Sequence, residues 1–274
     1  MRRTMLLPGA LLAILAIAPH SQVAAASGQA IAAAPAAECS INWLGHEAEI
    51  EKFIAEAKVL KMEDVPIGVT KPQRATLEPG GPAGRFAWKP INPGYYRGFM
   101  ESYKAEIAAY QMDRLLGMNM VPPIVERVIN GRNGAAIMWV ENTRPWSIEK
   151  PPQGPEPGWS KQLTRMKMFD LLIANIDRNQ GNLIYDADWH LILIDHSRGF
   201  IGKKNLKGIA PIGRVDRQLW EKMQALTLES LETGLGKLVS TNDKKAILIR
   251  RDLMAKQIAE LVAKRGENSV FYDN

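Results

Sequence analysis

The stretch NIDRNQGN, residues 175–182, is followed shortly by the apolar run LILID, residues 191–195. Together they place Asp177, Asn182 and Asp195 within a short length of chain. A packed apolar core has no use for two carboxylates and an amide, whereas a metal-bound phosphate needs oxygen ligands of this kind. Taken singly, each residue is equally compatible with ordinary local structure, because Asp and Asn are common in turns.

The residues around this motif predict a hairpin. NLIYD (182–186) and WHLILID (189–195) read as two paired strands. Their pairing would bring Asn182 and Asp195 side by side. Phosphoryl transfer from ATP requires one carboxylate at the attacking hydroxyl and oxygen ligands for one or two metal ions. We therefore expect Asp177 to be the catalytic residue that accepts the hydroxyl proton, and Asn182 and Asp195 to bind Mg²⁺ or Mn²⁺.

A phosphoryl-transfer site also needs a cation on the nucleotide phosphates. RFAWKPI (85–91) reads as a strand with Lys89 near its end, and the helical pattern over 99–117 offers Glu106 as its partner. Either residue alone is equally well explained as a solvated surface charge. Glu106 lies roughly opposite the apolar stripe of its helix, so the pairing requires that this second face is covered as well.

The segment DVPIGVTKPQRATL, residues 64–77, is expected to form a hairpin over the nucleotide phosphates. The backbone amides of Val69, Thr70 and Lys71 would face the phosphates. The segment holds a single glycine and matches neither Gly-rich nucleotide fingerprint.

The segment MWVE, residues 138–141, is expected to connect two lobes. In that position the backbone of Met138 and Val140 would contact the adenine. A plain buried strand is an equally good interpretation of the same residues. In either case the segment marks the end of the sheet-rich half of the chain.

Several motifs together resemble the secretory-pathway kinases of the Golgi casein kinase type. They are AEIAAYQMDRLLGMNMVPP, residues 105–123, with WKP before it and NIDRNQGN and LIDHSRGF after it. The resemblance runs from about residue 60 to residue 260. It implies a two-lobed kinase fold, the use of ATP, and the phosphate, lysine-partner, catalytic and metal roles for Lys89, Glu106, Asp177 and Asp195, respectively.

The chain also departs from that family. It has one cysteine where those kinases are disulfide-bonded, and Asn179 stands where the family has a histidine. The spacing of Asp177 and Asn182 is shared with the wider superfamily, which includes phosphoinositide kinases and HipA-type toxin kinases. The resemblance therefore favours the superfamily over the subfamily, and the acceptor does not follow from it.

The order of predicted elements indicates an α+β protein with a two-lobed, protein-kinase-like fold. Residues 41–141 read as a helix over 45–62, three strands, a second helix and two strands joined at the turn NGRNG, which makes an N-terminal antiparallel sheet lobe. Residues 142–274 contain an apolar helix, the strand pair and three further helical patterns, which makes a mostly helical C-terminal lobe. A cleft between two such lobes is a usual place for a ligand.

The first 26 residues have the pattern of a secretory signal peptide. Arg2 and Arg3 precede an apolar run too short to span a bilayer, and Ala24-x-Ala26 supplies a small-residue cleavage site. An uncleaved anchor is the alternative. Residues 27–40 are predicted to be a flexible lead-in. The mature chain is therefore expected to be exported, either periplasmic or secreted, and to lack a transmembrane segment.

Composition narrows the class of partner. The formal net charge is +6, but the basic residues are scattered among acidic ones, whereas nucleic-acid binders usually gather them on one face. The sequence therefore argues against a nucleic-acid partner. One cysteine excludes an intramolecular disulfide, and so few cysteines and histidines argue against a zinc site. Any bound metal is expected to have oxygen ligands.

We therefore expect an exported ATP-dependent kinase that transfers the γ-phosphate to a hydroxyl of a protein or glycan acceptor. Two alternatives stay open: a kinase of the same fold that acts on a phosphoinositide or a small molecule, and a catalytically dead nucleotide-binding module. The presence of Lys89, Asp177, Asn182 and Asp195 argues against the dead module. The scarcity of ATP outside most cells argues for it.

Overall fold

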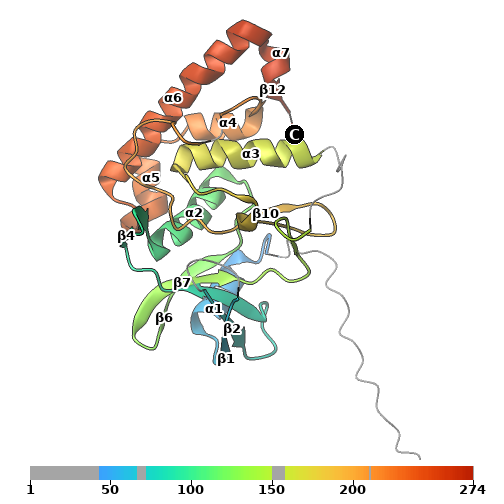
Figure 1. Cartoon of the computed structure of the whole chain (residues 1–274), viewed down its shortest axis with the longest axis vertical. Helices are drawn as coiled ribbons and strands as arrows, with labels where there is room; N and C mark the ends of the chain where they lie inside the picture. The colour runs from blue at the N-terminus through green and yellow to red at the C-terminus, as the bar shows by residue number, and fades with distance from the viewer. Residues whose placement is uncertain (1–42, 67–71, 150–157, 210, 274) are drawn as a thin grey trace, which may run out of the picture. The chain divides into compact units, whose positions relative to one another are not determined.

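The computed structural model describes residues 43–66, 72–149, 158–209 and 211–273 (Figure 1). These residues lie within one compact unit, Ala37–Asn274. The predicted signal peptide 1–26, the lead-in 27–40 and the predicted phosphate-facing residues Val69, Thr70 and Lys71 lie outside the described residues.

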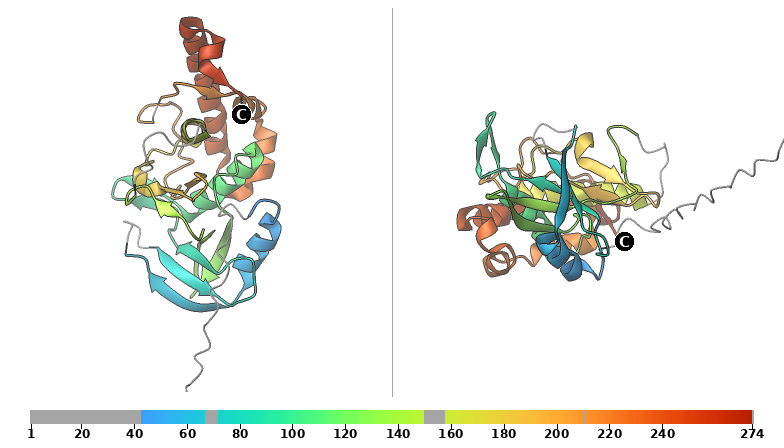
Figure 2. Two further views of the ribbon diagram at one scale, coloured as in Figure 1. Left: turned by 90° about the vertical axis from the view of Figure 1, so that its right-hand side faces the viewer. Right: turned by 90° about the horizontal axis from the view of Figure 1, so that it is seen from below.

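The N-terminal part is built on a five-stranded antiparallel sheet with the order β1-β2-β3-β7-β6. Its strands are β1 (Val59–Asp64), β2 (Gln73–Leu77), β3 (Arg85–Lys89), β6 (Ile124–Ile129) and β7 (Arg132–Met138). Helix α1 (Glu47–Glu56) packs against β6 and β7, as Figure 2 shows. A separate hairpin of β4 (Gly94–Tyr96) and β5 (Phe99–Glu101) leads into helix α2 (Tyr103–Leu116).

The first helix ends earlier than the sequence predicts. Helical spacing extends over residues 45–62, but α1 ends at Glu56, and Ala57 leaves the helix with ψ 146°. The following residues form the edge strand β1, which pairs with β2, and Leu60 is 54% exposed rather than on an apolar helix face. Pairing with β2 gives this segment its backbone hydrogen bonds, so tertiary structure overrides the local pattern.

Helix α2 begins and ends where local chemistry favours it. The hydroxyl of Ser102 caps the first turn by accepting a hydrogen bond from the amide of Lys104 at 3.0 Å. Gly117 ends the helix in the left-handed conformation, with φ 59°. The predicted helix over 99–117 is therefore correct at its end but begins too early, because residues 99–101 pair as β5.

The C-terminal part is mostly helical, as the sequence predicts. Its helices are α3 (Gly158–Ile173), α4 (Arg217–Gln224), α5 (Leu228–Leu235), α6 (Thr241–Arg265) and α7 (Glu267–Val270), with short 3-10 turns η1 (Gln180–Asn182) and η2 (Gly236–Leu238). A small antiparallel sheet has the order β10-β9-β8, formed by β10 (Leu191–Leu193), β9 (Leu183–Tyr185) and β8 (Arg144–Pro145). Strand β11 (Val215–Asp216) pairs in parallel with β12 (Phe271–Tyr272).

Helix α2 belongs to both halves of the fold. Its buried residues Ala108 and Met112 join the larger apolar core with α3 and the C-terminal helices, and the helix also packs against β6 and β7 of the sheet. A smaller core lies between α1 and the sheet, around Ile54 and Phe86. The position of α2 relative to β3 is therefore fixed from two sides.

One glycine allows the strand that carries Lys89 to lie close to its neighbour. A Cβ atom added at Gly134 in β7 would lie 2.9 Å from the carbonyl oxygen of Lys89 and 3.0 Å from the Cα of Pro90. Both contacts are with backbone, which cannot move away without shifting β3. A side chain at this position would therefore displace the backbone of Lys89 and Pro90 at the end of β3.

Replacing Gly134 by alanine should lower the free energy of unfolding by about 1–3 kcal/mol, as expected for overpacking. Gly84→Ala is the matched control, because a Cβ at Gly84 would have no heavy atom within 4 Å, and its effect should be close to zero. Chemical denaturation of the two variants measures the difference. Equal stability of both variants would contradict the close packing of β7 on β3.

Candidate active site

Lys89 lies at the centre of a buried ionic cluster. Its Nζ is 2.8 Å from Oε1 of Glu106 and 3.0 Å from Oδ1 of Asp195. The side chains of Lys89, Glu106 and Asp195 are 8%, 0% and 31% exposed, respectively. The structure thus brings together three of the residues that the sequence singled out, from β3, α2 and the segment after β10.

Local structure explains how each of these side chains reaches the cluster. Lys89 ends β3 and pairs with Ala135 of β7. Glu106 lies in the first turn of α2, and its second oxygen, Oε2, accepts the amide of His196 at 2.8 Å. Asp195 adopts the left-handed conformation, with φ 62°, directly after β10. The face of α2 that carries Glu106 is covered, as the pairing requires.

Burial and charge set the protonation of the cluster. Burial alone would lower the pKa of Lys89, but the carboxylates of Asp195 and Glu106 outweigh it and raise that pKa. Burial favours a neutral Asp195, but Lys89 outweighs this effect and lowers the pKa of the carboxyl. Burial, together with the charge of Asp195, raises the pKa of Glu106 despite the opposing effect of Lys89. Lys89 therefore stays charged at neutral pH.

Arg178 clamps the loop that carries Asp177. Its Nε and Nη2 donate to the two carboxylate oxygens of Asp170 in α3, at 2.9 and 3.0 Å. Its Nη1 donates to the carbonyls of Asn182 and Ile194, at 3.0 and 2.9 Å. Sequence reasoning did not identify Arg178 or Asp170. The available signal was a charged residue within the apolar helix α3, where Asp170 is buried.

His196 is buried and neutral. Its Nε2 lies 2.8 Å from Nη2 of Arg178; because a guanidinium only donates, Nε2 accepts and Nδ1 carries the proton. Burial lowers the pKa of His196 well below its ordinary value, and the charges of Arg178 and Lys89 lower it further. Its Nδ1 lies 3.9 Å from Oε2 of Glu106, so the ring packs beside the cluster without a close hydrogen bond to it.

Asp177 and Asn182 are joined through the backbone. Nδ2 of Asn182 donates to the carbonyl of Asp177 at 2.9 Å, so the amide oxygen Oδ1 points away from that contact. The pairing of Leu183 with Leu193 continues through the amide of Ile194, which donates to the carbonyl of Asn182 at 3.2 Å. Asn182 is therefore held next to the segment that leads into Asp195, although the strands are shorter than the sequence predicts.

Oxygen atoms that could bind a metal are available on both Asn182 and Asp195. The contacts of Asp195 with Lys89 and with Ser197, at 3.0 and 3.3 Å, both use Oδ1. Oδ2 of Asp195 and Oδ1 of Asn182 remain for other ligands, as far as the described part of the chain goes. Two oxygen donors of this kind fit Mg²⁺ or Mn²⁺.

The predicted adenine contacts lie where the chain leaves the sheet. Met138 ends β7 and Val140 follows it, and both side chains are buried. The amide of Met138 donates to the carbonyl of Pro123 at 2.9 Å, and the carbonyl of Val140 accepts the hydroxyl of Thr143 at 3.2 Å. These segments lead to β8, so residues 139–143 form the connector between the two sheets.

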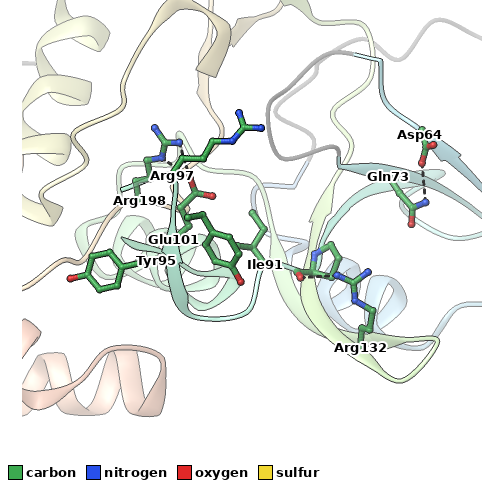
Figure 3. A pocket seen from close by; sticks show the side chains of 10 residues that line it. Asp64, Gln73, Ile91, Tyr95, Arg97, Glu101, Arg132 and Arg198 are labelled. Carbon is green, nitrogen blue, oxygen red and sulfur yellow. Dashed lines mark hydrogen bonds and ion pairs between the residues drawn. The ribbon is translucent and has the colours of Figure 1, made fainter. Parts of the chain in front are cut away.

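The carboxylate of Asp177 is 42% exposed and pairs with Arg198, whose Nη1 lies 2.9 Å from Oδ2. Arg198 also lines a cavity of about 670 Å³, shown in Figure 3. Tyr95 and Arg97 of the β4–β5 hairpin form one wall of the cavity. Asp64 of β1 and Gln73 of β2 also line the cavity. Sequence analysis did not assign Arg198 a role in the site, so this connection was missed.

A second group of potential metal ligands lies in the loop between β9 and β10. It comprises Asp186, Asp188 and His190. Asp186 is buried and accepts hydrogen bonds from the amides of Asp188 and His190, at 3.0 and 2.8 Å. These contacts hold the β9–β10 loop in place, and this structural role is enough to explain why the three residues lie close together.

Comparison with known proteins identifies solved structures with a similar fold. No protein-family model matches the chain, and no curated protein matches it in sequence. A solved structure of the Golgi casein kinase with Mn/ADP bound is 15% identical with a TM-score of 0.62, covering 84% of this chain and 80% of that one. The structure of hydra Fam20 with sugar is 17% identical with a TM-score of 0.65, covering 84% and 93%.

The chain has a protein-kinase-like fold. The similarity predicted from WKP, NIDRNQGN and LIDHSRGF is confirmed at the level of the fold. The antiparallel sheet and α2 correspond to the predicted N-terminal lobe, and the helices from α3 onward to the predicted C-terminal lobe.

The ionic cluster leads to a prediction about stability. Lys89→Met should leave the fully buried carboxylate of Glu106 without a cation and cost about 3–5 kcal/mol of unfolding free energy. The double variant Lys89→Met, Glu106→Gln removes both charges and keeps an acceptor for the amide of His196, so it should recover most of that loss. Denaturation at neutral pH measures both.

Lys61→Met is the matched control. Lys61 also lies in a strand and pairs with Glu63 at 2.8 Å, but its side chain is 65% exposed, so its loss should cost no more than about 1 kcal/mol. A double variant less stable than Lys89→Met alone would contradict the coupling of Lys89 to Glu106.

Proposed function

We propose that this protein is an ATP-dependent kinase that transfers the γ-phosphate to a hydroxyl of a protein or glycan acceptor. The observation that carries the proposal is the buried cluster of Lys89, Glu106 and Asp195, set beside a loop that presents Asp177 and Asn182. A charged lysine fixed by two carboxylates next to oxygen ligands matches what phosphoryl transfer requires of an active site. The structural similarity to the Golgi casein kinase, whose structure holds Mn/ADP, supports the same conclusion.

Each residue has a distinct role in this proposal. Lys89 binds the nucleotide phosphates, and Glu106 holds its ammonium in place. Oδ2 of Asp195 and Oδ1 of Asn182 hold Mg²⁺ or Mn²⁺, which when bound neutralises phosphate charge. Backbone groups of Met138 and Val140 at the adenine, and of Val69, Thr70 and Lys71 at the phosphates, complete the proposed nucleotide site.

Asp177 acts on the acceptor. Its Oδ2 is engaged by Arg198, so Oδ1 is the oxygen that would orient the acceptor hydroxyl and accept its proton. The cavity beside the β4–β5 hairpin is lined by Arg198, the ion-pair partner of Asp177. Its volume of about 670 Å³ is within the range of ligand pockets, so the acceptor hydroxyl would approach from this cavity.

We propose further that the protein is exported. The pattern of residues 1–26 supports this proposal. Separately, among the described residues no helix has the length and apolar character to cross a membrane. Intact-mass analysis of protein from the native host should show a chain that begins near Ser27. A full-length mass in the cytosolic fraction would contradict export.

Two substitutions separate metal binding from acceptor chemistry. Asp195→Asn should weaken metal-dependent binding of a non-hydrolysable ATP analogue, because it removes a charged metal ligand. Asp177→Asn should bind the analogue like wild type, but phosphoryl transfer should fall by about 10² to 10⁴-fold, the usual loss for a general base. Calorimetric titration measures binding, and phosphate release from ATP with transfer to a panel of protein and glycan acceptors measures chemistry.

Asp188→Asn is the control, because Asp188 is an exposed aspartate of the β9–β10 loop outside the proposed site. It should bind and react like wild type. If Asp177→Asn and Asp195→Asn both also behave like wild type, the proposed function is wrong, and the motif has only a structural role.

A further inference from the structure

We infer that Arg198 is a positioning residue that holds the carboxylate of Asp177 for the acceptor and ties it to the β4–β5 hairpin. The inference rests on the proposed function, because it gives Asp177 the role of general base. It adds a residue with no assigned role, on a different segment from both of its partners. The contacts of its guanidinium with three residues, Asp177, Glu101 and Phe99, carry the argument.

The guanidinium of Arg198 bridges two carboxylates. Nη1 lies 2.9 Å from Oδ2 of Asp177, and Nη2 and Nε lie 2.7 and 2.8 Å from Oε1 of Glu101. The Cζ atom of the group lies over the ring of Phe99, 4.3 Å from its centroid. A planar group with donors on two edges can make all of these contacts at once, whereas an ammonium cannot.

The two carboxylates differ in burial, and this difference indicates which of them fixes the position of Arg198. The side chain of Glu101 is 6% exposed, that of Arg198 is 15% exposed and that of Asp177 is 42% exposed. Glu101 is therefore the fixed anchor, and Asp177 is the partner that would otherwise rotate in solvent. Arg198 holds one oxygen of Asp177 and so directs the other.

Backbone contacts make the anchor part of the cluster around Lys89. The amide of Ser102, directly after Glu101, donates to the carbonyl of Ser197 at 2.9 Å. Ser102 is also the N-cap of α2, the helix that carries Glu106. The β4–β5 hairpin, the start of α2 and the segment from Asp195 to Arg198 are therefore directly connected.

The hairpin also forms a wall of the cavity that Arg198 lines. Figure 3 shows Tyr95, Arg97, Glu101 and Arg198 around this cavity. Tyr95 is 82% exposed, so an acceptor in the cavity can contact the hairpin that anchors Arg198. Contact at the hairpin would thus affect the orientation of the catalytic carboxylate.

A double-mutant cycle on metal-dependent ATP hydrolysis tests the inference, with water as the acceptor. Arg198→Lys keeps the charge but cannot bridge both carboxylates, and should lower kcat by about 10- to 100-fold, the size of effect that follows from misplacing a catalytic group. The KM for ATP, the affinity for a non-hydrolysable analogue and the melting temperature should stay at the wild-type values. In the Asp177→Asn background, Arg198→Lys should have no further effect.

Arg217→Lys is the matched control. Arg217 also pairs with two carboxylates, Glu267 and Asp273, at 2.9 and 3.1 Å, and lies 4.6 Å from the ring centroid of Phe271. It lies on α4, outside the proposed site. Its replacement should leave hydrolysis unchanged.

Glu101→Gln is a second variant, which weakens the anchor without removing Arg198. It should lower kcat in the same direction and by less, and this effect too should vanish in the Asp177→Asn background. It keeps the test decisive if Arg198→Lys does not fold.

Several results would overturn the inference. Effects of Arg198→Lys and Asp177→Asn that multiply would show that Arg198 does not act through Asp177. A faster Arg198→Lys enzyme would show that the ion pair holds an inactive state. Parallel loss of nucleotide affinity and melting temperature would show a structural role alone. If Asp177→Asn hydrolyses ATP like wild type, or wild type shows no metal-dependent hydrolysis, the proposed function itself fails.

Discussion

A charged lysine in the interior is the constraint on which the rest of the site depends. Removing an ammonium from water is costly unless opposite charges meet it in good geometry. Lys89 is met by Glu106 from α2 and Asp195 from the segment after β10. Its burial therefore requires the sheet, the helix and the small C-terminal sheet to lie in one particular arrangement.

Arginine bridges link this cluster to the loop of Asp177 and to the β4–β5 hairpin. Arg178 joins α3 to the loop of Asp177 and to β10 through Asp170, Asn182 and Ile194. Arg198 then joins that loop to the β4–β5 hairpin. Apolar packing forms the two cores, but charged side chains with fixed geometry hold the reactive groups relative to one another. Each of these bridges uses the fork of donors that only arginine provides.

The sequence predicts the elements whose boundaries depend on local chemistry. Gly117 ends α2 and the Asn130–Gly131 turn joins β6 to β7, because both require left-handed backbone. The strand of Lys89 and the helix of Glu106 follow from their periodicity. The end of α1 at Glu56 could not be predicted, because the helical spacing continues into a segment that pairs as an edge strand.

The candidate site was predictable only in part, because some of its contacts join residues that only the fold brings near one another. Lys89, Glu106, Asp177, Asn182 and Asp195 stand out by residue type and spacing. The structure brings the side chains of Lys89, Glu106 and Asp195 together. Arg178 and Arg198 resemble ordinary surface charges in the sequence. Their roles depend on partners that only the fold brings near, such as Glu101, which lies 97 residues before Arg198.

The central claim is that the cluster around Lys89 forms a metal-dependent nucleotide site. Calorimetric titration of the wild-type chain with a non-hydrolysable ATP analogue tests it most directly, once with Mn²⁺ or Mg²⁺ and once with EDTA. The account predicts binding at one site in the presence of metal and much weaker binding in EDTA. No binding in either condition, or binding of equal strength in both, would contradict it.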